Sequence, residues 1–76
     1  MQVVMYTKPD CPYCVKARNL LNMLAIPYTQ IEVGVGISSE DYVANFWPTV
    51  PCVVVDGEII GGYTELGNWS VNKYFG

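Results

Sequence analysis

The apolar residues of this chain recur with a period that changes along the sequence, and each change indicates a different element. Val3 to Thr7 is a short apolar run of the kind found in buried strands. From Pro12 to about Ala25, apolar residues recur every three or four positions with polar residues between them, which predicts an amphipathic helix. Pro12 suits the first helical turn, where its missing N–H costs nothing, and Pro27 lies just beyond the helix end.

A second strand and a short helix are predicted next. Tyr28 to Val33 alternates between apolar and polar residues, as a half-buried strand does. Ser38, with Asp41 three residues later, is typical of a capped helix start, and this helix would run to about Phe46 before Pro48 ends it. Strand and helix therefore alternate twice in this part of the chain.

The remaining residues predict a hairpin and a last helix. Pro51 to Val55 is apolar and rich in β-branched residues, Asp56-Gly57 is a tight turn, and Glu58 to Ile60 returns as a strand. Thr64 is predicted to cap a helix that runs to about Tyr74. This order of elements predicts an α/β fold with a small sheet flanked by helices.

Composition places the chain among small domains. With 76 residues, of which 51% are hydrophobic, it can form one core of marginal size. No apolar run reaches the roughly 18 residues of a membrane span, and the first residues lack the features of a signal peptide. Three cysteines are too few for a secreted disulfide framework. We expect a single domain over residues 1–76, a monomer in the cytoplasm with no membrane partner.

Charge argues against a nucleic-acid partner. The net charge is −3, and the chain has only four basic residues, which cannot neutralise many phosphates. Three of them, Lys8, Lys16 and Arg18, are clustered around a pair of cysteines.

The segment Cys11-Pro12-Tyr13-Cys14 indicates redox chemistry. Two cysteines three positions apart at a helix start can close a disulfide, and the unpaired N–H groups of the helix favour a thiolate at the first. Thiol–disulfide exchange needs an attacking thiolate and a second thiol that releases the mixed disulfide, and Cys11 and Cys14 supply them. The chain has no histidine, so the helix start and Lys8 would have to lower the Cys11 pKa, into the range of roughly 3.5 to 7.5.

The alternative for such a pair is a structural clip or a zinc site. Structural zinc takes four ligands, and this chain has three cysteines and no histidine. We therefore expect no metal site.

Four motifs spread over nearly the whole chain make it similar to the dithiol glutaredoxins of the thioredoxin superfamily. Tyr6-Thr7-Lys8 precedes Cys11-Pro12-Tyr13-Cys14, Thr49-Val50-Pro51 follows further on, and Gly61-Gly62-Tyr63-Thr64 comes before Trp69. The resemblance implies a thioredoxin-like fold whose four-stranded mixed sheet has the order 2-1-3-4 and is flanked by three helices. It also implies a cis peptide bond before the proline of the third motif.

The resemblance further implies the reaction and its partners. Cys11 would attack and Cys14 would resolve, with glutathione as co-substrate and no bound cofactor. Disulfide-containing proteins would be the other partners, with ribonucleotide reductase as a candidate because the motifs are similar to those of small bacterial glutaredoxins.

Glutathione would lie between the loop of the third motif and the start of the last helix. Lys8 would face the glycyl carboxylate, Tyr13 would form a wall, and the Val50 backbone would pair with the cysteinyl part. The backbone N–H of Thr64, helped by Glu65, would hold the γ-glutamyl end. The implied glutathione-binding residues are Lys8, Tyr13, Thr49, Val50, Pro51, Gly62, Tyr63, Thr64 and Glu65.

Two residues depart from the family pattern. Pro48 occupies a position where many glutaredoxins carry a polar or basic residue, which puts one contact with the glycyl carboxylate in doubt. Cys52 replaces a long polar residue and is interpreted as a half-buried small hydrophobic residue, with an accessory redox site as the alternative. Trp47 and Trp69 are interpreted as packing residues, Trp69 in the core.

Two other functions remain open at this stage. One is a thioredoxin-like reductant that a flavoprotein reductase recharges. The other is an iron–sulfur carrier that shares a cluster between two chains through Cys11 and glutathione, although relatives that bind clusters usually lack a proline at the position of Pro12.

Overall fold

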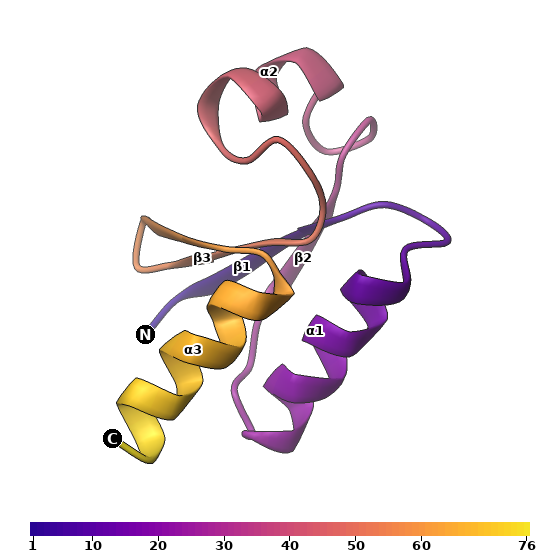
Figure 1. Ribbon diagram of the computed structural model, residues 1–76. Helices are drawn as coiled ribbons and strands as arrows, with labels where there is room; N and C mark the ends of the chain where they lie inside the picture. The colour runs from indigo at the N-terminus through magenta and orange to yellow at the C-terminus, as the bar shows by residue number, and fades with distance from the viewer.

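Every element that the pattern of apolar residues predicts is present in the structure, a computed structural model that describes residues 1–76 (Figure 1). In chain order the elements are β1 (Val3–Thr7), α1 (Pro12–Met23), β2 (Thr29–Glu32), α2 (Ser39–Asn45), β3 (Cys52–Val55), β4 (Glu58–Gly61) and α3 (Tyr63–Tyr74).

The four strands form one mixed sheet in the order β2-β1-β3-β4. β1 runs parallel to β2, with Val4 opposite Thr29, and antiparallel to β3, with Tyr6 opposite Cys52. β3 and β4 form the predicted antiparallel hairpin. α1 and α3 lie on one side of the sheet and α2 on the other (Figure 1). This is the thioredoxin-like fold that the motifs implied, and it places the residues after β1 at the edge where ligands of α/β sheets bind.

The core has one part on each face of the sheet, because successive side chains of a strand point to opposite faces. The part under α1 and α3 consists of Val3, Met5, Ala17, Leu21, Ile26, Val53, Val55 and Leu66. The part under α2 consists of Tyr6, Val33, Tyr42, Cys52 and Val54. Trp69, predicted in the core, is partly buried and packs against the edge of the first part. No helix combines the length and the apolar character that crossing a membrane requires.

α1 ends two residues earlier than predicted. Ala25 takes a left-handed conformation with φ of 57°, and its N–H donates to the Asn22 carbonyl while the Ile26 N–H donates to the Leu21 carbonyl. These two bonds form a Schellman ending, which satisfies carbonyl groups at the end of a helix. Glycine usually marks such an ending, so the alanine gave no signal in the sequence.

α3 begins at Tyr63, so the prediction that Thr64 caps this helix is wrong. Gly62 is the residue before the first helical turn, and its N–H donates to Glu65 Oε1 at 2.9 Å. A carboxylate in the first turn also interacts favourably with the positive end of the helix dipole. The cap is therefore made by a residue inside the helix that reaches back.

Candidate active site

The two cysteines of the Cys-x-x-Cys segment lie between β1 and α1 and form a disulfide, with a Cα–Cα distance of 5.2 Å. Cys11 caps α1, and Pro12 occupies the first turn, as predicted. Cys14 is only 1% exposed, whereas Cys11 is partly exposed. A substrate can therefore reach the first sulfur, and the second sulfur lies behind it.

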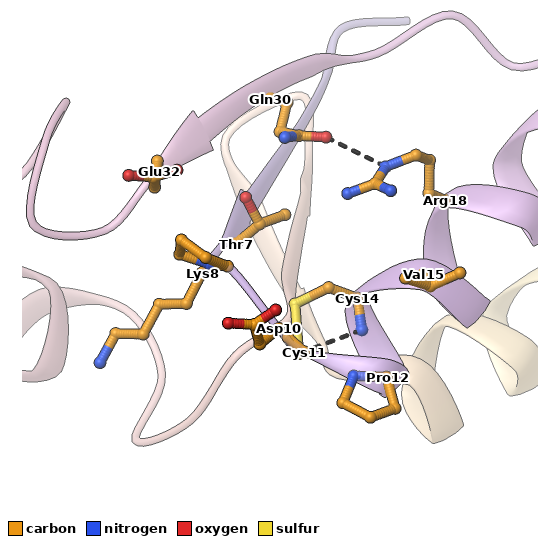
Figure 2. A pocket seen from close by; sticks show the side chains of 11 residues that line it. Thr7, Lys8, Asp10, Cys11, Pro12, Cys14, Val15, Arg18, Gln30 and Glu32 are labelled. Atoms are coloured by element: carbon orange, nitrogen blue, oxygen red, sulfur yellow. Dashed lines mark hydrogen bonds between the residues drawn. A yellow bond between two sulfur atoms is a disulfide. The ribbon is translucent and has the colours of Figure 1, made fainter.

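The surroundings of Cys11 favour a negative charge on its sulfur. The backbone N–H of Cys14 donates to Cys11 Sγ at 3.2 Å (Figure 2), and no acidic residue lies in the first turn of α1. An N–H donor and the positive end of the helix both lower the pKa of a thiol in the reduced pair. The Cys11 sulfur also lies 3.9 Å from the carbonyl oxygen of Val50. The Cys-x-x-Cys segment is therefore in contact with the Thr49-Val50-Pro51 motif.

A hollow of about 580 Å³ lies on one side of the pair and is named the Lys8 hollow here. It is lined by Thr7, Lys8, Pro9, Asp10, Cys11, Pro12, Cys14, Val15, Arg18, Gln30 and Glu32. Arg18 Nε donates to Gln30 Oε1 at 3.2 Å, which ties α1 to β2. Figure 2 shows the exposed Lys8 side chain extending away from the disulfide. The cations and carboxylates of this hollow give it no single sign of charge.

A second hollow, of about 230 Å³, lies between the third motif and the start of α3 and is named the Pro51 groove. It is lined by Tyr13, Trp47, Thr49, Val50, Pro51, Gly62, Tyr63, Thr64 and Glu65. The peptide bond between Val50 and Pro51 is cis, as the motifs implied. The structure thus brings together every implied glutathione-binding residue except Lys8, which lines the other hollow.

The walls of the Pro51 groove are aromatic. The rings of Tyr13 and Tyr63 have centroids 6.2 Å apart, and Lys16 Nζ lies 5.0 Å from the Tyr13 centroid. The exposed fraction of Tyr13 is 57%, which confirms that this residue is not part of the core. The carboxylate of Glu65 is engaged by the Gly62 N–H, so Glu65 shapes the start of α3 from inside the groove.

Trp47 is the residue of the groove that the sequence did not reveal. It packs against the core under α2 and also lines the groove, where a Cβ added to Gly61 would lie 3.1 Å from its Cζ2 atom. Its signal was available, because an indole two residues before Thr49-Val50-Pro51 can reach a site formed by that motif. The sequence pattern indicates a packing residue only, and the structure adds a place in the lining of the groove.

Cys52 is fully buried and not half-buried as predicted. It pairs with Tyr6 across the sheet and points into the core under α2, next to Tyr42. Burial raises the pKa of the Cys52 thiol to about 11, although the neighbouring Tyr42 hydroxyl has a smaller effect in the opposite direction. The thiol is therefore neutral at physiological pH. The structure contains no group of three or more His, Cys, Asp or Glu residues placed to hold a metal ion.

Comparison with known proteins decides the family. A family model of glutaredoxins matches residues 3–60. The chain belongs to the glutaredoxin family. It is 35% identical to glutaredoxin 1 of Escherichia coli, over an alignment that covers 91% of this chain and 92% of that protein.

Solved glutaredoxin structures agree with this assignment. The structure of oxidised E. coli glutaredoxin superimposes with a TM-score of 0.81 at 32% identity, over 100% of both chains. A crystal structure of a buckwheat glutaredoxin–glutathione complex superimposes with a TM-score of 0.78 at 25% identity, over 93% of this chain and 69% of that one. Glutaredoxins are thiol–disulfide oxidoreductases. The chain is therefore an enzyme of this class, with Cys11 and Cys14 as its Cys-x-x-Cys pair.

Proposed function

We propose that this glutaredoxin uses glutathione to reduce protein disulfides and glutathione mixed disulfides. The observation that carries the proposal is the Pro51 groove, whose lining contains eight of the nine residues implied as glutathione-binding and which meets Cys11 through Val50, 3.9 Å away. The similarity to a plant glutaredoxin that was solved with glutathione supports the same ligand class.

The reaction transfers two electrons to the substrate. The Cys11 thiolate attacks one sulfur of the substrate disulfide, so a mixed disulfide forms and the first substrate thiol leaves with a proton. Cys14 loses its proton, attacks Cys11 Sγ and releases the second substrate thiol, which leaves the pair oxidised. One glutathione then attacks Cys11 Sγ and releases Cys14, and a second takes the first away as oxidised glutathione.

Glutathione has two carboxylates and one amine, and the groove offers matching partners. The backbone of Val50 pairs with the cysteinyl part, and the N–H of Thr64 at the start of α3 binds the γ-glutamyl carboxylate, as helix starts bind anions. The glycyl carboxylate extends past Cys11 toward Lys8, which lies on the other side of the pair. Tyr13 and Trp47 form the side walls.

The setting of the enzyme is part of the same proposal. Glutathione acts as a reductant in the cytoplasm, where thiols are kept reduced, and we place the enzyme there as a monomer. Its protein substrates would include ribonucleotide reductase, on the similarity of its motifs to those of small bacterial glutaredoxins.

Two variants and two assays test the division of roles. Cys11→Ser should abolish reduction of both a glutathione mixed disulfide and a protein disulfide. Cys14→Ser should keep the first activity and lose most of the second, because glutathione can replace the second thiol only when the mixed disulfide contains glutathione. Equal losses in both variants and both assays would contradict the assignment. Efficient reduction of the wild type by a thioredoxin reductase, with no turnover by glutathione, would favour the thioredoxin-like function instead.

A further inference from the structure

Tyr42 is the one buried residue of α2, with an exposed fraction of 2%. Its ring packs in an aromatic cluster, 5.5 Å from the Tyr6 ring and 6.1 Å from the Phe46 ring between centroids. Its hydroxyl group donates a hydrogen bond to the carbonyl oxygen of Thr49. α2 is thus connected to the loop that forms one wall of the Pro51 groove.

This loop, residues 47–51, has few other polar attachments. None of the backbone hydrogen bonds outside the helices and strands involves its residues. Two polar contacts reach it from elsewhere in the chain: the Tyr42 hydroxyl at Thr49 and the Cys11 sulfur at the Val50 carbonyl, 3.9 Å away. Because the sulfur changes partners during each catalytic cycle, the Tyr42 hydroxyl is the constant attachment.

A carbonyl oxygen can only accept, so this hydrogen bond requires that the Tyr42 hydroxyl keep its proton. Burial raises the pKa of Tyr42, so its hydroxyl keeps its proton at neutral pH. The Cys52 thiol beside it is also neutral, since burial raises its pKa to about 11, and no thiolate competes for the tyrosine proton. The Tyr42 hydroxyl therefore keeps its proton and donates it in the hydrogen bond to the Thr49 carbonyl oxygen.

We propose that Tyr42 is a positioning residue for substrate binding: its hydroxyl holds the Thr49–Val50 backbone in the position beside Cys11 that glutathione binding requires. The inference rests on the proposed use of glutathione. It makes the affinity of the Pro51 groove for glutathione depend on a residue outside the groove. Tyr42 touches neither the ligand nor the reacting sulfurs, so its removal should affect binding and leave the chemical step intact.

The test compares Tyr42→Phe with Tyr6→Phe. Both remove one hydroxyl from the same aromatic cluster and keep the ring, but the Tyr6 hydroxyl makes no hydrogen bond within the chain, so Tyr6→Phe is the matched control. Loss of one neutral hydrogen bond should raise the KM for glutathione about 3- to 10-fold in Tyr42→Phe, with kcat within about twofold. Tyr6→Phe should keep the wild-type KM.

A second measurement does not depend on turnover. The amide NMR signals of Val50 and Cys11 should shift in Tyr42→Phe and stay unchanged in Tyr6→Phe, and the Kd of S-methylglutathione should rise in parallel with the KM. An unchanged KM in Tyr42→Phe, an equal rise in both variants, or unshifted amide signals at Val50 would overturn the inference. If the wild type binds no S-methylglutathione, the proposed function fails, and the amide signals still decide whether Tyr42 positions the loop.

Discussion

Gly61→Ala should destabilise this protein strongly, because the structure has no room for a side chain at that position. Gly61 ends β4 with φ of +124°, a conformation that L-residues rarely adopt. An added Cβ would lie 2.8 Å from Glu65 Cγ, 2.9 Å from Glu65 Cβ and 3.1 Å from Trp47 Cζ2. Neither neighbour moves freely, since the Glu65 carboxylate caps α3 and the indole packs against the core.

The magnitude follows from two terms. A residue with a side chain in such a backbone conformation costs about 1–3 kcal/mol, and overpacking a filled site costs about 1–3 kcal/mol more. If Glu65 rotates away to relieve the contact, the cap at Gly62 is lost, at about 1 kcal/mol. We expect the free energy of unfolding to fall by about 2–6 kcal/mol, a large part of the roughly 5–15 kcal/mol that small domains have.

Gly67→Ala is the matched control. Gly67 lies inside α3, and a Cβ added there would meet nothing within 4 Å. Replacing a helical glycine with alanine should raise the free energy of unfolding by about 0.5–1 kcal/mol. Equilibrium urea unfolding of the two variants and the wild type measures both effects. A free energy of unfolding for Gly61→Ala within about 0.5 kcal/mol of the wild type, or a change in the same direction for both substitutions, would contradict this prediction.

Three further predictions concern Lys8 and Cys52. Lys8→Glu should raise the KM for glutathione several-fold, because an exposed contact of this kind contributes about 1 kcal/mol. The distant Lys73→Glu should leave the KM unchanged, and equal KM values for the two variants in steady-state assays would contradict the prediction. The Cys52 thiol should resist iodoacetamide at pH 7 in the folded protein, and alkylation as fast as that of Cys11 would show otherwise. Because its pKa is raised from 9.0 to about 11, folded Cys52 keeps a proton that the unfolded chain loses, so stability should fall between pH 9 and 11 by up to about 3 kcal/mol. Urea unfolding at these pH values should show a smaller fall in Cys52→Ala, and an identical fall would contradict the assignment.

The elements, the redox pair and the resemblance to a family could all be predicted from local features of the sequence. Strands and helices have different periods of apolar residues, and each period is visible within a few residues, so β1 and α1 were predictable from local pattern alone. The role of Cys11 was equally local, since the helix start that favours its thiolate is made by the residues that follow it. The motif Thr49-Val50-Pro51 carried the resemblance and its cis bond.

Which residues share a surface depends on the packing of the elements and could not be predicted from local patterns. Thr64 was a plausible cap, but α3 begins one residue earlier, at Tyr63, and Glu65 Oε1 accepts a hydrogen bond from the Gly62 N–H. Lys8 lies near Cys11 in sequence, yet the turn after β1 sends its side chain into a different hollow from the Pro51 groove (Figure 2). Tyr42 contacts the loop because α2 packs its one buried side chain beneath it. These contacts depend on how elements pack against one another, and a local pattern of apolar and polar residues contains no information about which polar groups that packing brings together.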